Sequence, residues 1–434
     1  MIESIVVQGG RRLTGTVRAS GAKNAVLPIL AATLLADGPC EIHNVPDLSD
    51  VHLMLEILQE LGVQTSFEQG VVRTLVVDET ISTAPYELVN AMRASICVLG
   101  PLLAKRKRAK VAQPGGCVIG ARPIDLHVKG LKALGADLQT VHGFLEGSTD
   151  GLKGSLIFLG GPFGSTVTGT ANVMMAAALA AGTTIVEQAA CEPEVEDLAN
   201  FLIAMGADIQ GAGTPRVTVR GVPQLTGARH RVIPDRIEAE TFMIAAAITA
   251  GDITVDDCRP DHMVAVTEVL REAGASVDVL APTKVRVRGT RYVRAVDVTT
   301  FAYPGYPTDA QAQIMALMAI ADGISVVTDK IYPDRYMHMA EYNRMGAQIR
   351  KIGSTAVVQG VEFLSGAPVK ATDLRASAGL ILAGLVADGE TQMHQVHHLD
   401  RGYDRMEHKL VQLGAEIRRE RREPRRRASD RSAA

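Results

Sequence analysis

Tryptophan is absent, and aromatic residues make up only 4% of the 434 residues. A surface that stacks nucleic-acid bases needs aromatic side chains, so this scarcity argues against such a platform. A strong net charge is also missing, because the formal net charge is −3. No basic face for nucleic acid is therefore expected over most of the chain. We expect the main partners to be small molecules.

Cysteine is scarce, and its spacing shows no pairing pattern. The cysteines are five in number, far apart and without a CxxC pair: Cys40, Cys97, Cys117, Cys191 and Cys258. This spacing indicates neither a disulfide framework nor a zinc site, and no metal or cofactor is expected. The first residues show no cationic n-region or long apolar run, so no secretory leader is expected. The apolar stretches are shorter than the roughly 20 residues that cross a bilayer. We expect a cytoplasmic protein without a membrane partner.

Two short patterns each recur six times. In the first, a glycine follows a predicted amphipathic helix, at Gly62, Gly135, Gly206, Gly274, Gly346 and Gly414, with spacings of 73, 71, 68, 72 and 68 residues. In the second, an Ala-, Leu- and Met-rich segment precedes each glycine, at 25–37, 95–104, 172–181, 239–250, 311–322 and 376–388. The glycine is typical of a helix C-terminus, and segments apolar on nearly all sides are typical of buried helices.

These repeats predict an α/β fold of two inside-out, barrel-like domains, each built from three βαβαββ units with buried helices. We expect residues 23–229 to form the domain with Cys117. Residues 1–22 and 230–417 would form the second domain, with Asp309 and Arg401. The arginine-rich residues 418–434 are expected to be a basic disordered tail, with contact to nucleic acid or an anionic surface as the alternative.

One thiol lies in a glycine-rich segment, Pro114-Gly115-Gly116-Cys117-Val118-Ile119-Gly120, five residues before Arg122. Three glycines leave this backbone free to move. A cysteine is more often a small buried apolar residue. Here the loop composition and the nearby cation favour a reactive thiolate, whereas the other four cysteines lie in apolar contexts.

Polar residues stand before the predicted buried helices, where a core does not need them. They include Lys23, Asn24, Arg93, Arg236, Asp309, Asp373 and Arg375. Each one alone is explained as a helix cap or as an ion pair at a domain rim. Together with Arg122 and Arg401, however, the cations predict a ligand with phosphate and carboxylate groups, bound at helix N-termini. Asp309 is then either a helix cap or a general base.

Other polar residues receive supporting roles. We expect Asp50, Glu192 and Asp235 to be ion-pair partners of the cations. His127 and His398 are expected to form hydrogen bonds or to pack, because no second His or Cys stands at metal-ligand spacing.

Several motifs resemble the UDP-N-acetylglucosamine 1-carboxyvinyltransferase family of enolpyruvyl transferases. The resemblance as a whole covers residues 1–417. The motifs that carry it are Ser20-Gly21-Ala22-Lys23-Asn24-Ala25, Met92-Arg93-Ala94-Ser95, 114–127, 303–313, Thr372-Asp373-Leu374-Arg375-Ala376-Ser377 and Leu399-Asp400-Arg401-Gly402-Tyr403. The resemblance implies the same two-domain fold. It implies transfer of the enolpyruvyl group of phosphoenolpyruvate to the 3-hydroxyl of UDP-N-acetylglucosamine, the first committed step of peptidoglycan synthesis.

The resemblance also implies roles for single residues. Lys23, Arg122 and Arg401 would hold phosphoenolpyruvate, with Arg93 nearby. Asn24 and Asp309 would meet the sugar, and Asp309 would be the general base. Cys117 would act as a general acid or as the thiol of a covalent phospholactoyl adduct. The remaining implied substrate contacts are Ala121, Pro123, Ile124, Asp125 and Leu126 at the uridine end, Gly164, Ser165, Thr166 and Val167 at the diphosphate, Ile331 at the nucleotide sugar, and Arg335, Asp373 and Arg375 from the second domain.

The loop Gly160-Gly161-Pro162-Phe163-Gly164 departs from the family pattern, because a basic residue found there in some relatives is absent. Two alternatives stay open at this point. One is transfer to shikimate 3-phosphate, which shares the fold and the donor. The other is an inactive relative that senses UDP-N-acetylglucosamine.

Overall fold

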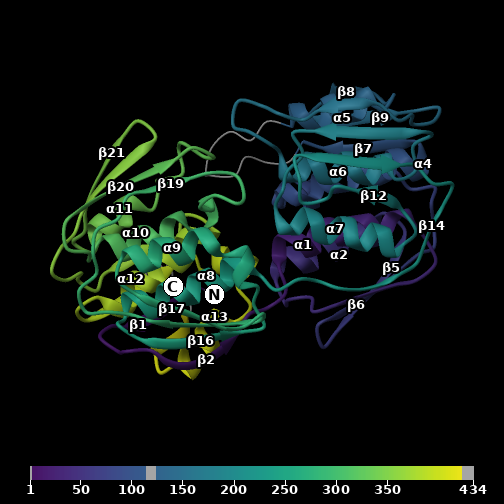
Figure 1. Ribbon diagram of the computed structural model, residues 1–434. Helices are drawn as coiled ribbons and strands as arrows, with labels where there is room; N and C mark the ends of the chain where they lie inside the picture. The colour runs from purple at the N-terminus through teal and green to yellow at the C-terminus, as the bar shows by residue number, and fades with distance from the viewer. Residues whose placement is uncertain (1, 114–123, 423–434) are drawn as a thin grey trace, which may run out of the picture.

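The computed structural model describes residues 2–113 and 124–422, and within them the chain forms two lobes, each around its own hydrophobic core (Figure 1). One core draws on residues from Ala22 to Val232. The other combines Ile5 to Ala19 with residues from Ala239 to Ile417. We call these parts the first and the second lobe.

The repeating unit is most regular in the fifth copy. It contains β19 (Val298–Thr300), η4 (Thr308–Ala310), α10 (Gln311–Met318), β20 (Ile324–Asp329), α11 (Met339–Arg344), β21 (Gln348–Ile352) and β22 (Thr355–Gln359). The strands lie in the order β19-β20-β22-β21, with β19 parallel to β20 and the hairpin antiparallel. This is the expected βαβαββ unit.

The third unit follows the same plan in the first lobe, whereas the described part of the second unit has only an isolated bridge, between Thr83 and Lys110, in place of the leading strand. The second contains α3 (Tyr86–Ala91), η2 (Arg93–Val98), α4 (Leu99–Arg106), β7 (Arg108–Ala112), α5 (Asp125–Ala133), β8 (Asp137–Val141) and β9 (Phe144–Ser148). The third contains β10 (Leu156–Phe158), α6 (Val167–Ala177), β11 (Thr183–Glu187), α7 (Pro193–Ala204), β12 (Asp208–Gln210) and β13 (Arg216–Arg220). Their sheets have the orders β7-β9-β8 and β10-β11-β13-β12.

The first and fourth units exchange their leading strands. The first contains α1 (Lys23–Ala32), η1 (Thr33–Leu35), β3 (Ala36–Asp37), β4 (Cys40–His43), α2 (Ser49–Glu60), β5 (Val63–Glu68) and β6 (Val71–Val76). The fourth contains α8 (Arg236–Ile248), β16 (Asp252–Asp256), η3 (Pro260–His262), α9 (Val264–Glu272), β17 (Ser276–Ala281) and β18 (Lys284–Arg288). Strand β2 (Thr14–Arg18), which precedes α1, pairs with β16, whereas β15 (Arg229–Arg231), which precedes α8, pairs with β4. Strand β14 (Leu225–Thr226) pairs with β3.

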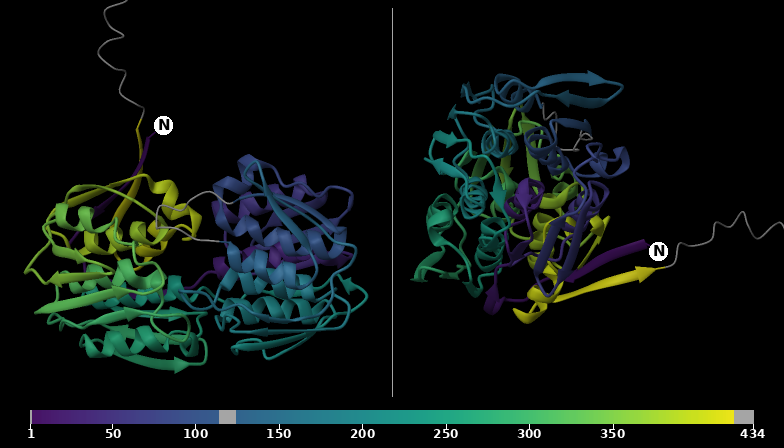
Figure 2. Two further views of the ribbon diagram at one scale, coloured as in Figure 1. Left: turned by 90° about the horizontal axis from the view of Figure 1, so that it is seen from above. Right: turned by 90° about the vertical axis from the view of Figure 1, so that its right-hand side faces the viewer.

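The sixth unit also takes a strand from the start of the chain. It contains β23 (Pro368–Lys370), α12 (Leu374–Val386), β24 (Glu390–His394), η5 (Val396–Arg401), α13 (Met406–Gln412) and β25 (Glu416–Arg422). Strand β1 (Ile2–Gln8) lies between β24 and β25 and is antiparallel to both. The ends of the described chain thus meet in one sheet, where β1 and β25 lie side by side (Figure 2).

The chain crosses between the lobes twice, and the two crossings run side by side. Ala22 N donates to Ile233 O at 2.8 Å, and Asp235 N donates to Ser20 O at 2.7 Å. A Cβ at Gly21 would lie 1.7 Å from the carbonyl oxygen of Asn44, so only glycine fits there. Because β15 still pairs in the first lobe, the expected boundary after residue 229 is too early, and the crossing follows Ile233.

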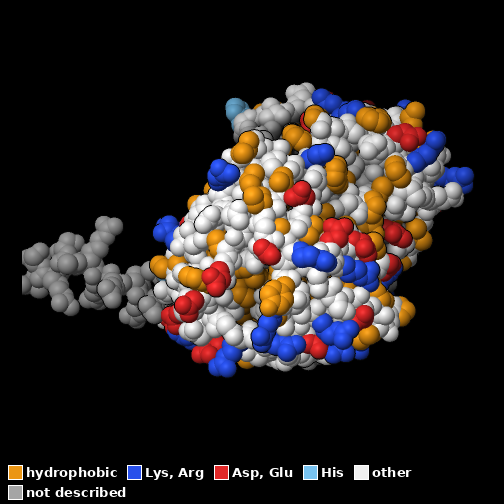
Figure 3. All heavy atoms as spheres, turned by 60° about the vertical axis from the view of Figure 1, so that its left-hand side comes forward, with side chains coloured by type: hydrophobic (Ala, Val, Ile, Leu, Met, Phe, Trp, Pro, Cys, Tyr) orange, Lys and Arg blue, Asp and Glu red, His pale blue; other side chains and the backbone are white. Residues whose placement is uncertain are grey.

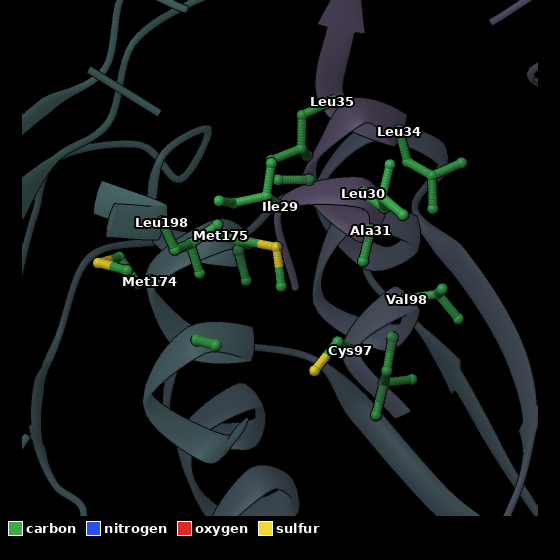
Figure 4. Close-up of a cluster of buried hydrophobic side chains, with 14 of the residues drawn as sticks. Ile29, Leu30, Ala31, Leu34, Leu35, Cys97, Val98, Met174, Met175 and Leu198 are labelled. Atoms are coloured by element: carbon green, nitrogen blue, oxygen red, sulfur yellow. The ribbon is translucent and has the colours of Figure 1, made fainter. Parts of the chain in front are cut away.

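Helices fill the inside of each lobe, as the sequence predicts. Figure 4 shows Ile29 and Leu30 of α1, Cys97 of η2, Met174 and Met175 of α6, and Leu198 of α7 gathered in one cluster of the first lobe, and all of these are at most 2% exposed. The sheets lie outside the helices, and none of those formed by the described residues closes into a barrel. The expected inside-out α/β architecture is therefore present.

Glycine ends the second helix of every unit in the described chain. Each of these glycines follows the C-cap residue and has a positive φ: 78° at Gly62, 96° at Gly135, 108° at Gly206, 104° at Gly274, 92° at Gly346 and 97° at Gly414. A left-handed residue after the C-cap lets the chain turn back toward the sheet at little steric cost when that residue is glycine.

The expected tail begins too early. Residues 418–422 belong to β25, where Arg421 pairs with β1 and Arg418 pairs with β24. Arg421 Nε donates to Glu3 Oε1 at 2.7 Å, and Arg418 Nη2 donates to Glu390 Oε2 at 3.0 Å. Residues 423–434 lie outside the described residues.

The surface mixes both signs of charge. On the face shown in Figure 3, Lys and Arg side chains lie among Asp and Glu side chains, with hydrophobic side chains scattered between them. A search of the helices in the described ranges finds none with the length and hydropathy of a membrane span.

Candidate functional site

The first part of the site joins Lys23 and Arg401 through Asp50. Lys23 begins α1 immediately after the inter-lobe crossing, and its Nζ lies 2.7 Å from Asp50 Oδ2. From the second lobe, Arg401 Nε donates to Asp50 Oδ1 at 2.9 Å and Arg401 Nη2 to Asp50 Oδ2 at 3.4 Å. One carboxylate of α2 therefore holds cations from both lobes.

Burial and charge act together on this group. Lys23 is 9% exposed, and burial, aided by the charges of Arg375 and Arg401, lowers its pKa although Asp50 opposes the shift. Burial works against the charged form of Asp50, but Lys23 and Arg401 lower its pKa below the usual range. A lysine that is buried among other cations is well placed to bind an anion.

The second part of the site is built on Asp309, at the start of α10. Arg335 Nη1 donates to Asp309 Oδ1 at 2.9 Å, and Arg375 Nη2 donates to Asp309 Oδ2 at 3.2 Å. Asn24 Nδ2 donates to Asp309 Oδ2 at 3.3 Å from the first lobe. Three donors from both lobes therefore fix the orientation of this carboxylate.

The arginines around Asp309 are themselves held by the N-terminus of α12. Asp373 caps this helix, accepting hydrogen bonds from the backbone N of Arg375 at 2.9 Å and of Ala376 at 3.2 Å. Its Oδ1 also lies 3.7 Å from Arg335 Nη2. Arg375 is 1% exposed, and its Nε and Nη1 make no hydrogen bond with the described residues. The Arg375 guanidinium also lies over the Tyr403 ring, 5.3 Å from its centroid, so packing as well as Asp309 holds it in place.

Ile331 lies close to this second part. The backbone N of Ile331 donates to Asp329 Oδ1 at 3.0 Å, and Thr308, next to Asp309, donates to Asp329 Oδ2 at 2.7 Å. Asp329 thus ties the segment after β20 to the segment that carries Asp309.

Arg93, Asp125, Leu126 and His127 define a third region, in the first lobe. His127 Nδ1 is 2.9 Å from Asn172 Nδ2, and its Nε2 is 3.1 Å from Thr168 Oγ1. Burial, together with the charge of Arg93, lowers the pKa of His127 to about 3, so the imidazole is neutral. His127 therefore forms hydrogen bonds, as predicted.

The glycine-rich loop before α6 adjoins this region, and the backbone N of Gly164 takes part in a turn within the loop. A Cβ at Gly161 would meet Leu126 Cδ1 at 3.1 Å, so the loop and the start of α5 are neighbours. The backbone N of Gly164 donates to Gly161 O at 3.0 Å, closing a tight turn. The expected contact of Gly164 with the diphosphate stays a prediction. Thr166 caps α6, accepting from Gly169 N at 3.2 Å.

The structure brings together Lys23, Asn24, Asp309, Arg335, Asp373, Arg375 and Arg401, and it brings Ile124, Asp125 and Leu126 beside the loop that leads to Ser165, Thr166 and Val167. Cys117, Ala121, Arg122 and Pro123 lie outside the described residues. The remaining thiols are free, and burial raises the pKa of Cys97 to about 12 and of Cys258 to about 11.

The supporting carboxylates were only partly predicted. Asp50 is an ion-pair partner as expected. Asp235, by contrast, accepts backbone hydrogen bonds from Ile237 at 2.8 Å and from Lys23 at 3.2 Å, because it caps α8. The inter-lobe partner of Arg236 is Glu194, at 2.9 Å, rather than Glu192. The position of Glu194 in the first turn of α7, after Pro193, is the only sequence signal for this role.

Comparisons with known proteins match the whole architecture. The profile of the EPSP synthase (3-phosphoshikimate 1-carboxyvinyltransferase) family matches residues 7–410. The UDP-N-acetylglucosamine 1-carboxyvinyltransferases of Methylacidiphilum infernorum and Desulfosudis oleivorans are 51% and 52% identical, and each match covers 96% of this chain and 99% of the relative.

Solved structures agree. The enolpyruvyl transferase NikO from Streptomyces tendae has a TM-score of 0.86 at 25% identity, over 96% of this chain and 99% of that protein. EPSP synthase from Acinetobacter baumannii has a TM-score of 0.72 at 19% identity, over 97% of this chain and 100% of that protein. The expected fold class is confirmed.

Proposed function

Because the chain belongs to the UDP-N-acetylglucosamine 1-carboxyvinyltransferase family, we propose that the site between its lobes transfers the enolpyruvyl group of phosphoenolpyruvate to the 3-hydroxyl of UDP-N-acetylglucosamine, with release of phosphate. The chain is a transferase of peptidoglycan synthesis. We further propose that phosphoenolpyruvate is the donor, that the single residues have the roles given below, and that the enzyme works in the cytoplasm.

The observation that carries the proposal is the charge arrangement between the lobes. Lys23 and Arg401 meet at Asp50, and Arg335 and Arg375 meet at Asp309. Buried cations are tolerated where anions neutralise them, and the four cations here outnumber their carboxylate partners in the described ranges, which are Asp50, Asp309 and Asp373. A small donor that carries both phosphate and carboxylate groups would balance this excess. Arg93 and Arg122 would add to the same positive field.

In the proposed reaction, Asp309 removes the proton from the 3-hydroxyl of the sugar while C3 of phosphoenolpyruvate gains a proton. The sugar oxygen then bonds to C2, giving a tetrahedral intermediate that still carries phosphate. Loss of a proton from C3 and breakage of the C2–O bond to phosphate restore the double bond. Asn24, Arg335 and Arg375 would hold Asp309 toward the sugar.

The remaining residues support this addition and elimination. Lys23 and Arg401 would stabilise the negative charge of the intermediate. Cys117 would serve as the general acid or as the thiol of a phospholactoyl adduct. Residues 121–126 and Ile331 would contact the nucleotide sugar, and the backbone of Ser165, Thr166 and Val167 would face the diphosphate at the N-terminus of α6.

The test is sugar-dependent phosphate release. The purified chain is incubated with phosphoenolpyruvate alone, with UDP-N-acetylglucosamine added, or with shikimate 3-phosphate added. We expect phosphate only with the nucleotide sugar, in step with a product heavier by one enolpyruvyl group in the mass spectrum. If shikimate 3-phosphate but not UDP-N-acetylglucosamine causes phosphate release, the acceptor is shikimate 3-phosphate. If neither compound causes phosphate release, the proposal is overturned.

A further inference from the structure

Arg419 occupies a place that the strand pattern reserves for an apolar side chain. On β25, residues 417, 419 and 421 share one face, because side chains alternate along a strand. Ile417 is 7% exposed, and Arg419 lies opposite Ile5 of β1, which is 0% exposed. The side chain of Arg419 is 22% exposed, whereas that of Arg421 is 65% exposed. An inward arginine in this sheet requires a specific partner.

Arg419 has carboxylate partners on three other elements. Its Nη1 and Nη2 donate to Asp400 Oδ2 at 3.1 Å and to Asp400 Oδ1 at 2.5 Å, a bidentate pair. Its Nε lies 2.9 Å from Glu407 Oε1 of α13, and its Nη1 lies 3.5 Å from Glu3 Oε2 of β1. The fork of a guanidinium matches a carboxylate in a fixed orientation, which an ammonium cannot do.

The partner of Arg419 is the residue next to Arg401. Asp400 and Arg401 end η5, whose cap residue Gln395 has a positive φ of 61°. Arg401 is held on one side by Asp50 of the first lobe, and Asp400 is held on the other side by Arg419. The short η5 segment is therefore fixed between α2 and β25, and a shift at Asp400 moves the Arg401 backbone directly.

We propose that Arg419 is a positioning residue that fixes Asp400 and thereby places Arg401 for binding of the phosphoenolpyruvate anion, which presupposes the role given above to Arg401. Arg419 does not touch the substrate. Without it, Asp400 and Glu407 lose the cation between them, Glu3 keeps Arg421, and η5 loses its anchor on β25.

The experiment compares Arg419→Gln and Arg419→Lys with the wild-type enzyme in the phosphate-release assay. For Arg419→Gln we expect KM for phosphoenolpyruvate to rise about tenfold and KM for UDP-N-acetylglucosamine to stay within about twofold, because small misplacement of a binding group has effects of this size. Arg419→Lys keeps the charge without the fork, so it should unfold near the wild-type temperature and still show a raised KM for phosphoenolpyruvate. This variant keeps the test valid if Arg419→Gln does not fold.

Two comparisons separate positioning from stability. Arg418→Gln and Arg421→Gln remove exposed ion pairs on the same strand and should leave both KM values unchanged. Combining Arg419→Gln with Asp400→Asn removes the carboxylate repulsion, so the melting temperature should recover while KM for phosphoenolpyruvate stays high. The role of Arg419 is overturned if the double variant recovers both the melting temperature and KM for phosphoenolpyruvate. It is also overturned if KM is unchanged in Arg419→Gln while the wild type is active. Neither outcome affects the proposed function. A wild type without sugar-dependent release overturns both proposals.

Discussion

Asp309 is the side chain on which the lobes converge, since donors reach it from α1, from the segment after β20 and from α12. Replacing it with Ala removes the proposed base and leaves Arg335 and Arg375 without their carboxylate. We expect kcat to fall about 10²- to 10⁴-fold, while binding of UDP-N-acetylglucosamine, measured by calorimetry, weakens only a few-fold. Asp334→Ala is the control, because its side chain is 79% exposed and pairs with Lys351 at the surface. Loss of sugar binding alone would make Asp309 a positioning residue.

The thiols differ in their expected reactivity. Burial raises the pKa of Cys40, Cys97 and Cys258, and that of Cys191 is raised by partial burial and by Glu192. These thiols are protonated near neutral pH and react slowly. An epoxide mimic of phosphoenolpyruvate should therefore label Cys117 alone, and Cys117→Ser should abolish labelling and cripple turnover. Peptide mass mapping reads the site, and label spread over the other cysteines would refute an activated Cys117.

Glu240 of α8 makes stability depend on pH. It is 1% exposed, and burial raises its pKa to about 8, with Asp235 and Glu194 adding to the shift and Arg236 and Arg375 opposing it. A raised folded-state pKa means that its contribution to stability is complete below about pH 4.5 and is lost as the pH rises to about 8.

Glu240→Gln removes this titration. We expect the variant to exceed the wild type by roughly 2–5 kcal/mol in the free energy of unfolding at about pH 8, and to match it near pH 4.5. Urea unfolding at both pH values measures the difference, with Glu268→Gln, an exposed carboxylate on α9, as the control. A difference that does not change with pH would contradict the assignment.

The same local feature ends a helix in each unit of the described chain, where a glycine with positive φ follows the C-cap residue. Gly206 has φ +108° and open space around it, so Gly206→Ala meets only backbone strain, about 1 kcal/mol. Gly62 has φ +78°, and an added Cβ would lie 2.4 Å from Asp78 O. Gly62→Ala should therefore destabilise the protein by clearly more than Gly206→Ala in denaturant unfolding. Equal losses would show that the Asp78 contact relaxes freely.

Local rules explain which features could be predicted from the sequence. The helix ends, the buried helices and the unit length follow from residues within one repeat, and so they were predicted. Residues 1–22, which include β2, were expected in the second domain. The pairing of β15 with β4 was not predicted, because Arg229 and its partner Glu41 lie 188 residues apart and nothing local encodes their contact. Residues 418–422 were predicted to be part of a solvated tail. Their partners Glu3 and Glu390 lie on other strands, 418 residues from Arg421 and 28 residues from Arg418, and local sequence does not show these pairs. The family resemblance implied that Asn24 and Asp309 both meet the sugar, but the hydrogen bond between them is known only from the structure.

The two lobes of the chain are also joined by the buried pair of Arg236 and Glu194, whose side chains are 9% and 4% exposed. Breaking such a pair from one side leaves a buried charge alone. Glu194→Gln should therefore lower the free energy of unfolding by about 3–5 kcal/mol, whereas Glu194→Gln with Arg236→Met should recover much of the loss. Thermal unfolding of the three proteins checks this, and equal stability of the single variant and wild type would exclude a structural role for the pair.

The position of β1 between β24 and β25 sets an order of events on the ribosome. Strand β1 precedes the residues of the first lobe in the chain, whereas both of its partners, β24 and β25, follow α12. Ile5, Val6 and Val7 therefore stay without their strand partners until β24 and β25 have been made. An unpaired apolar strand can meanwhile pair with wrong strands. The sheet of the second lobe is complete only once β25 has been made and has paired with β1.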